Sequence, residues 1–173
     1  MNDSDGVTPT QSGLPRWLSL VLTAWATLVG APLMHGALPN ALSSLAPRRG
    51  WARGRPGAWN LLGLIPIAAG CALLAWSGAL HVRSMPARVE LRPTPNYLVR
   101  RGPYAFTRNP MWLGGLALWL GWAIFYGSWP VLGGAGLWAA VTHFLFIPHE
   151  ERVLEARFGE TYRQYRESVR RWI

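Results

Sequence analysis

Three long stretches without charge constrain the fold of this chain: residues 17–47, 56–82 and 109–148 contain no Asp, Glu, Lys or Arg. A bilayer core of about 30 Å takes about 20 helical residues to cross, so the first two stretches each fit one crossing and the third fits two. No alternating strand pattern indicates a barrel, and helices satisfy their own backbone groups in lipid. The sequence predicts an all-α integral membrane protein with four transmembrane helices.

The turn inside the third stretch is predicted at "YGSWP", residues 126–130. Gly and Pro break helices there, and Trp and Tyr favour the boundary between lipid and water. The length of 173 residues fits a single domain, 1–173, in which a polar segment, 1–16, precedes the first span. Since this segment is acidic rather than basic, the first span is expected to be structure and not a cleaved leader.

The basic residues are all arginines, and their distribution predicts the orientation. Six lie between residues 81 and 109 and six follow residue 151, whereas four lie on the other side, namely Arg48, Arg49, Arg53 and Arg55. The bias places the second connection and the C-terminal tail in the cytoplasm, at a bacterial inner membrane. The four opposing arginines also fit a first segment that does not fully cross. The net charge is +9. Because the basic residues flank the membrane spans, lipid headgroups, and not nucleic acid, are the expected partners.

The second connection, 81–110, carries five prolines, which exclude a long helix. A connection of this length with Tyr, Phe, Leu and Val is typical of a functional, ordered loop. Asn109 and Pro110 predict a helix start, with Asn as the cap and Pro in the first turn. The free N–H groups of that helix end favour an anion. A capped helix with nothing bound is the equally open alternative.

The tail, 148–173, has an apolar stripe at steps of three and four residues, formed by Leu154, Phe158, Tyr162, Tyr165, Val169 and Trp172. Gly159 predicts a break between two amphipathic helices that lie on the membrane or over the second connection. Glu150 and Glu151 follow the last span. They are either solvated there, or one of them faces Asn109 and binds a cationic group.

Other patterns argue against some chemistries. The single cysteine, Cys71, and four histidines without two-ligand spacing indicate no metal site. No serine nucleophile elbow is present. The "GGAG" at 133–136 lies inside a span and indicates close helix packing rather than a phosphate loop.

Two segments together resemble a known family. "LVRRGPYAFTRNPMWLG", then a hairpin of two spans, then "EERVLEARFGETYRQYRESVRRWI" is similar to the isoprenylcysteine carboxyl methyltransferase family, which is related to phospholipid methyltransferases. The similarity covers about residues 80–173 in the family's order and spacing. It implies a membrane enzyme that binds S-adenosylmethionine in cytoplasmic regions 81–110 and 148–173, with a lipophilic acceptor entering from the bilayer.

Carried over by position, the resemblance assigns the cofactor to Asn96, Tyr97, Leu98, Val99, Tyr104, Asn109, Pro110, Met111, Trp112 and Glu150. The carboxylate of the cofactor suits the helix start, its ammonium suits Glu150, and its sulfonium and adenine suit the rings of Tyr104 and Trp112.

The chain departs from the family pattern at three positions. Asn109 replaces a histidine, Trp112 replaces a tyrosine, and Phe146 replaces an arginine that would engage the carboxylate of the acceptor. His143 or His149 is the candidate to take over the role of that arginine. A carboxylate or thiolate acceptor needs little acid or base help, whereas an amine or hydroxyl needs a base, for which Glu151 and His149 are candidates. A phospholipid amine or thiol methyltransferase and a non-catalytic four-span scaffold are the alternative functions.

Overall fold

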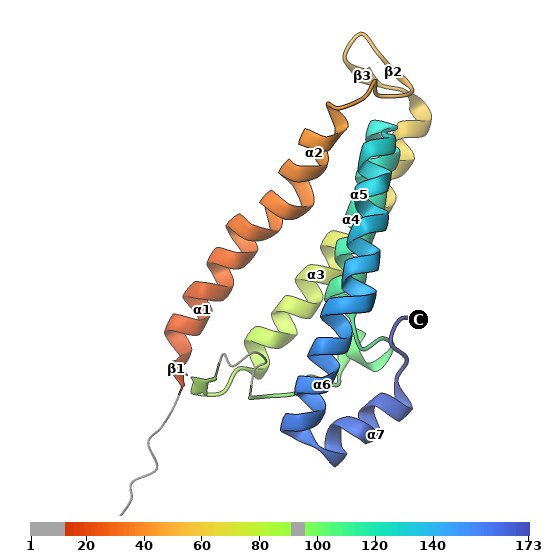
Figure 1. The fold of residues 1–173 in the computed structure, drawn as a ribbon. Coiled ribbons are helices and arrows are strands. Elements are labelled where there is room, and N and C mark those ends of the chain that lie inside the picture. Colours follow the sequence, from red (N-terminus) through yellow and green to blue (C-terminus); the bar gives the residue numbers. More distant parts are fainter. Residues whose placement is uncertain (1–12, 91–95) are drawn as a thin grey trace, which may run out of the picture.

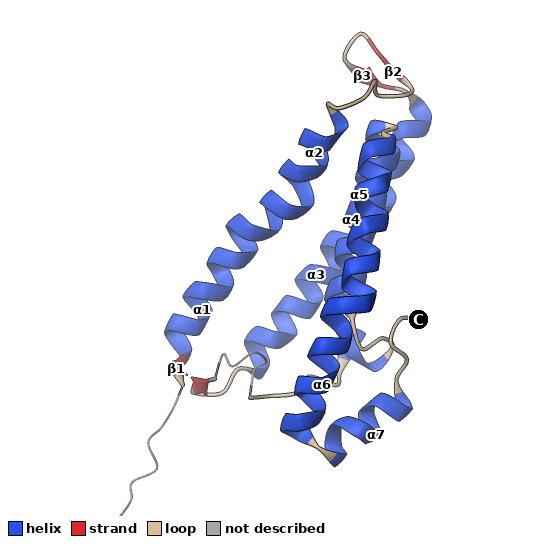
Figure 2. Ribbon diagram, viewed as in Figure 1, coloured by secondary structure: helices blue, strands red, loops and turns tan. Residues whose placement is uncertain are grey.

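The computed structural model describes residues 13–90 and 96–173 and is mostly helical (Figure 2). The α-helices are α1 (Arg16–Trp25), α2 (Leu38–Ser43), α3 (Leu64–Ser84), α4 (Pro110–Tyr126), α5 (Trp129–Val141), α6 (Ile147–Phe158) and α7 (Glu160–Ser168). Two antiparallel strand pairs are very short, β1 (Leu14–Pro15) with β4 (Arg88–Val89) and β2 (Trp51–Ala52) with β3 (Arg55–Pro56). The 3-10 turns are Ala58–Gly63 and Gly102–Ala105, and the π-helical turns are Ala26–Gly30, Leu33–Ala37 and Thr142–Phe146.

Continuous helices are longer than these labels suggest, because the π-helical turns join α-helices without a break. Three such helices are long and apolar enough to cross a membrane: Arg16–Ser43, Ala58–Ser84 and Trp129–Phe158. The fourth predicted span, α4, has 17 residues and is shorter. It ends at Gly127, whose φ of 57° forms the left-handed cap in the predicted turn. The chain is therefore an integral membrane protein with three full-length apolar helices and one shorter apolar helix.

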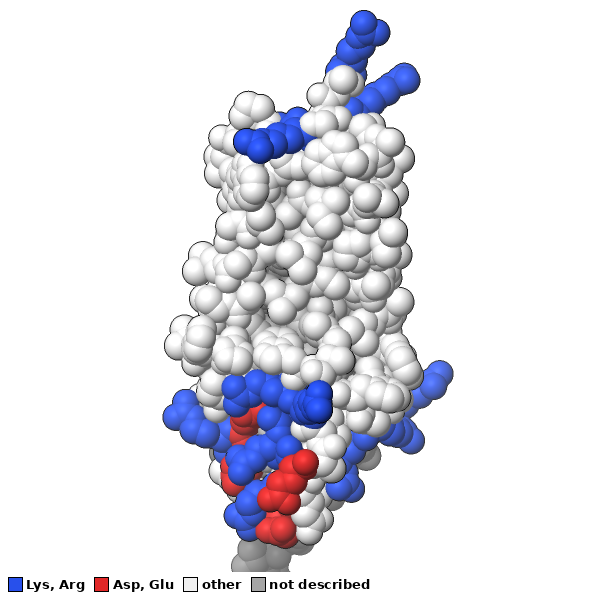
Figure 3. All heavy atoms as spheres, turned by 90° about the vertical axis from the view of Figure 1, so that its right-hand side faces the viewer, with Lys and Arg blue, Asp and Glu red and all other residues white. Residues whose placement is uncertain are grey.

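The surface carries charge at its two ends only, on the face that Figure 3 shows. An uncharged belt separates the β2–β3 end, where arginines project, from the end that carries α6 and α7, where arginines and carboxylates are mixed (Figures 1 and 3). A charge-free belt between polar ends is what a bilayer requires of a spanning bundle.

Glycines set the closest helix contact, between α3 and α4. A Cβ at Gly70 would lie 2.7 Å from the Gly114 carbonyl oxygen, and one at Gly121 would lie 2.7 Å from that of Gly63. Small residues allow backbones in a membrane to approach in this way. In the 133–136 segment, for which close packing was predicted, Gly134 alone meets a neighbour, Trp119, while Gly133 and Gly136 face open space.

Asn60 fastens the β2–β3 end. Its buried amide nitrogen lies 3.1 Å from the Arg49 carbonyl oxygen and 3.0 Å from that of Phe125, and its oxygen accepts a hydrogen bond from the Gly57 N–H. The Trp51 indole donates to the Phe125 carbonyl as well, at 2.9 Å. The first connection is thus bonded directly to the end of α4.

The N-terminal helix packs closely against the other spans at one end only. α2 packs on α4 and α5, whereas α1 diverges from α3 toward the α7 end (Figure 1). The start of α1 is held by the pairing of β1 with β4, where Leu14 faces Val89. Residues 1–12 of the predicted polar segment and 91–95 of the second connection lie outside the described residues.

Candidate functional site

A cavity of about 470 Å³ lies where the second connection, the tail and the spans meet. Its walls come from seven segments: the N-terminal helix, α3, the second connection, the start of α4, α5, α6 and α7. The volume is within the range of small-molecule sites, about 300–1,000 Å³. The cavity has a polar end, near α4 and α6, and an apolar part against the N-terminal helix.

The start of α4 forms part of the polar end. Pro110 occupies the first turn as predicted, and Asn109 stands at the cap position. The Asn109 side chain, however, makes no cap hydrogen bond. Its amide instead donates to the Arg171 carbonyl at 2.9 Å, because the tail folds over this point. The prediction of a side-chain cap was wrong, and the first-turn N–H groups of α4 are left without it.

Glu150 lies across the cavity end from that helix start. The Trp112 indole N–H donates to the Glu150 Oε2 at 3.2 Å, which joins α4 to α6. Trp112 is also stacked on Phe146, with ring centroids 5.6 Å apart and planes at 15°. A carboxylate and an aromatic face are therefore held side by side on the cavity wall.

Two tyrosines and a histidine form a second polar group on the wall. His81, near the end of α3, contacts the Tyr104 hydroxyl through Nε2 at 2.7 Å and the Tyr97 hydroxyl through Nδ1 at 3.3 Å. Burial raises the pKa of both phenols, and the Glu150 carboxylate raises that of Tyr104 further. Both tyrosines therefore stay neutral hydrogen-bonding groups at neutral pH.

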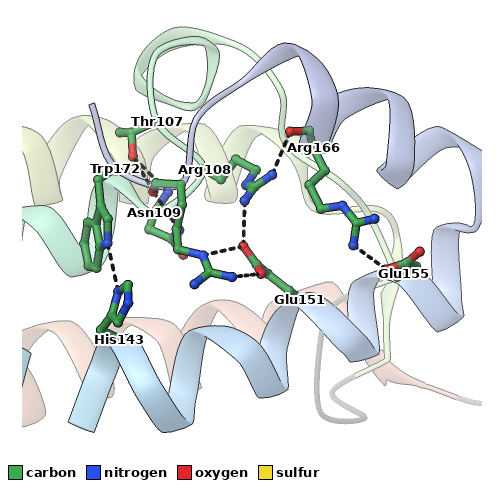
Figure 4. Close-up of polar contacts among 9 residues, drawn as sticks. Thr107, Arg108, Asn109, His143, Glu151, Glu155, Arg166 and Trp172 are labelled. Carbon is green, nitrogen blue, oxygen red and sulfur yellow. Dashed lines mark hydrogen bonds and ion pairs between the residues drawn. The ribbon is translucent and has the colours of Figure 1, made fainter. Parts of the chain in front are cut away.

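Glu151 forms ion pairs with two arginines, and Figure 4 shows these contacts. Arg108 lies 2.9 Å and Arg171 2.6 Å from its carboxylate oxygens. The Thr107 hydroxyl donates to the Arg171 carbonyl at 3.0 Å, and the Trp172 indole donates to His143 at 3.1 Å. We call this set the tail clamp: Thr107, Arg108, Asn109, His143, Glu151, Arg171 and Trp172. It confirms that the tail packs over the second connection.

The structure brings together most of the residues that the sequence assigned to the site. The cavity is lined by Tyr97, Leu98, Val99, Tyr104, Asn109, Pro110, Met111, Trp112, Glu150 and Glu151. Asn96 lies apart from the lining and bonds the backbone of Arg88 and Glu90. Phe146 contributes through its stack on Trp112, and His149 is exposed outside the lining.

Sequence reasoning missed the contribution of the N-terminal helix and of two histidines. Ala26, Thr27, Ala31 and His35 line the apolar part, and His81 joins the tyrosines. A titratable residue in each of the first two uncharged stretches was the available signal, because such residues are costly in lipid. Tyr162 and Tyr165 were predicted only as part of an apolar stripe, yet they also line the cavity.

Comparisons with known proteins match the region that builds this site. A family model described as phospholipid methyltransferase matches residues 65–161, more than half of the chain. A protein of Haemophilus influenzae described as uncharacterized is 35% identical over 63 residues, which are 36% of this chain and 100% of that protein. No solved structure matches the chain significantly.

Proposed function

Because this chain belongs to the phospholipid methyltransferase family, we propose that it transfers a methyl group from S-adenosylmethionine to a lipophilic acceptor in the membrane. The proposal is supported most directly by one observation. A single cavity combines the Glu150 carboxylate, the Trp112 ring and the amino end of α4.

The residues present fit this cofactor. The N–H groups at the start of α4 and the positive end of that helix suit its carboxylate, and Glu150 suits its ammonium. The faces of Trp112 and Tyr104 suit its sulfonium and adenine. When bound, the cofactor supplies an electrophilic methyl carbon.

The protein's part in the reaction is to position the two reactants and to exclude water. Glu150 and Trp112 lie together on one wall, with Phe146 stacked on Trp112, and the tail clamp holds α7 over the polar end. Alignment and removal of bulk solvent are the main contributions that a displacement at a methyl carbon needs. The described residues lack a metal-ligand cluster, and the reaction as proposed needs none.

The proposal includes a membrane topology with four crossings. We expect α4 to cross the membrane despite its length, since it packs along α3 and carries no charge. With four crossings, the arginine bias puts the tail clamp, and with it the cavity's polar end, in the cytoplasm of a bacterium. Membrane lipid then reaches the cavity from the side.

An isoprenylcysteine carboxylate is a less favoured acceptor. Phe146 stands where the resembling family has an arginine, and it is stacked on Trp112. Arg108, the one arginine on the described lining, is paired with Glu151. A phospholipid amine or a thiol avoids the need for a free cation.

The proposed function is tested by calorimetric binding of S-adenosylmethionine to detergent-purified protein. We expect the wild type to bind and Glu150→Gln to bind at least about tenfold more weakly, because a charge-assisted hydrogen bond contributes roughly 1.5–3 kcal/mol. Glu160→Gln is the matched control, since Glu160 pairs with Arg163 on the exposed face of α7. Absence of binding by folded wild type would favour the non-catalytic scaffold.

A further inference from the structure

We propose that His35 binds the reacting group of the acceptor and takes up its proton, so that the acceptor is a lipid with an N–H or S–H group and not a carboxylate. The inference rests on the proposed function and adds a residue and a substrate class to it. His35 lies outside the segment that the family model matches, 65–161.

The position of His35 in the fold is unusual for a histidine. It lies in the π-helical turn Leu33–Ala37 of a 28-residue apolar helix and lines the cavity. Titratable side chains within membrane helices are costly and mark functional sites far more often than surface ones do. A purely structural position here would be filled more cheaply by an apolar residue.

His35 lies close to the proposed cofactor wall. Its ring packs against Gly115, where a Cβ would come within 2.9 Å of the ring Cε1. Gly115 follows Trp112 by three residues, a rise of about 4.5 Å along α4. Trp138 lies between the two, with ring centroids 5.8 Å from His35 and 5.6 Å from Trp112. The imidazole is thus about one helical turn deeper in the membrane than the Glu150–Trp112 pair.

The Nδ1 atom of the His35 ring has unused hydrogen-bonding capacity in this structure. The Nδ1 atom is buried without a partner among the described residues, although such a group costs free energy. The backbone around it is fixed, because the Trp122 indole donates to the His35 carbonyl at 2.6 Å. The neighbouring Trp138 indole nitrogen is also buried without a partner in the described chain. Both groups suit a ligand with a polar head.

Access for a lipid is indicated by residues of the N-terminal helix that line the cavity and are also exposed at the surface. Ala26 and Thr27, in the π-helical turn that follows α1, line the cavity and are themselves exposed. The apolar part of the cavity therefore opens sideways, where a bilayer would present acyl chains. A lipid that enters there meets His35 on the way to Trp112.

The charges of the cavity favour a proton-bearing head over a carboxylate. Glu150 would repel a carboxylate, and Arg108 is already paired with Glu151. In the proposed step the proton of a thiol, or of an amine that enters as its ammonium form, passes to a nitrogen of the neutral imidazole, which becomes imidazolium. The lone pair left on the nitrogen or sulfur forms the bond to the methyl carbon. The bond between that carbon and the sulfonium sulfur breaks, and the sulfur keeps its electron pair.

The first test compares acceptors that differ only in the head: hexadecylamine, hexadecanethiol and palmitate, each with S-adenosylmethionine. We expect methylation of the amine or the thiol and none of palmitate. Transfer to palmitate alone, or to none of the three, would overturn the proposal.

The second test substitutes His35. Loss of a general base typically lowers a rate 10²- to 10⁴-fold, so His35→Phe and His35→Gln should each slow transfer at least about 100-fold. Met34→Phe is the matched control, because Met34 is the exposed neighbour in the same turn. Transfer by His35→Gln within about threefold of wild type would exclude proton uptake, since an amide cannot accept the proton.

A third measurement needs no turnover. A hexadecylamine with a diazirine beside the nitrogen is photolysed on cofactor-free protein, and the labelled peptides are mapped. We expect label on residues 26–35 in wild type and in His35→Gln, and at least about tenfold less in His35→Phe. Label confined to other segments contradicts the proposed acceptor position.

Cofactor calorimetry separates the two proposals. If the wild type binds S-adenosylmethionine and His35→Phe binds it within about twofold as tightly, a loss of methyl transfer in the variant reflects a defect at the acceptor and not at the cofactor. If His35→Phe loses cofactor binding, the residue supports the cofactor and this inference is wrong. If the wild type does not bind, the proposed function itself fails.

Discussion

Asn109 connects the start of α4 to the C-terminal segment through one buried hydrogen bond to the Arg171 carbonyl. At an ordinary helix cap, Asp is as favourable as Asn. Here only the amide can donate to a carbonyl. The two roles therefore predict opposite results for one substitution.

We expect Asn109→Asp to lower the free energy of unfolding by roughly 1–3 kcal/mol, because a carboxylate would face the Arg171 carbonyl without a proton to share. Asn109→Ala should cost about 1 kcal/mol. Denaturant unfolding in detergent measures both. A neutral or stabilising effect of Asn109→Asp would show that the residue works as a cap after all.

Tyr162 gives a prediction for alkaline pH. Its side chain is 1% exposed, and burial, with the nearby Glu151 charge, raises its pKa from 10.0 to about 12. A folded pKa above the unfolded one means that the stabilisation is complete below pH 10 and is lost as the pH rises toward 12. Between those limits the wild type should lose on the order of 2 kcal/mol more than Tyr162→Phe does. Parallel pH profiles of unfolding free energy for the two proteins would contradict this.

The residues of the site were predictable where a local rule identifies them. Pro110 is placed by helix-start chemistry, and Glu150 by its position after an apolar span. The partners of Asn109 and Glu151 were not predictable, because they come from the tail and depend on how it folds back. Whether the predicted residues bind the cofactor stays a prediction.

The joint between α6 and α7 depends on the backbone of Gly159, which has φ 53° and ψ −125°. A side chain at this position would meet no atom within 4 Å, so any cost is conformational. Gly136, within α5, also has open space, yet its backbone is helical. The two glycines form a matched pair that differs in backbone conformation.

Gly159→Ala should destabilise the protein by about 1–3 kcal/mol. Gly136→Ala should be neutral or stabilise it by up to about 1 kcal/mol, since Ala restricts the unfolded chain and favours helix. Thermal unfolding of both variants in one detergent is the measurement. Equal effects would mean that the positive φ is not required at the joint.

The helices followed from the uncharged stretches, but their contacts did not. The turn at Gly127 and the break at Gly159 were predicted from residue type and are confirmed. The close packing predicted for residues 133–136 is confirmed at Gly134, whereas Gly133 and Gly136 meet nothing within 4 Å. The closer contacts of Gly70 and Gly121 between α3 and α4 were not predicted, because neighbouring helices decide which face packs.

The whole molecule encloses its cavity with segments from both ends of the chain, and the tail clamp bonds the C-terminal segment to the second connection and to His143. A chain truncated after Ser168 loses the Arg171 bonds to Glu151 and Asn109 and the Trp172 bond to His143. We expect its affinity for S-adenosylmethionine to fall at least about tenfold, because α7 would then detach readily. Calorimetry tests this.

Deletion of Ile173 alone is the matched control, since that residue is 80% exposed. Its binding should equal that of wild type. An unchanged affinity of the longer truncation would show that the clamp holds the tail without shaping the site.

The family and the helical membrane character were recognisable from sequence, and the match to residues 65–161 confirms the family. The divergence of α1 was not predictable, because it depends on the short pairing of β1 with β4 and on packing of α2. The sequence marked this helix only as a possible incomplete crossing.

The junction around Asn60 has a mechanical consequence. Since its amide bonds the Arg49 and Phe125 carbonyls, one end of the bundle is fixed, while the opposite end of the N-terminal helix stands away from the spans (Figure 1). A helix of 28 residues is a lever about 42 Å long. A rotation of a few degrees at the fixed end would move the far end by several ångströms, and because β1 pairs with β4 there, the start of the second connection would move with it.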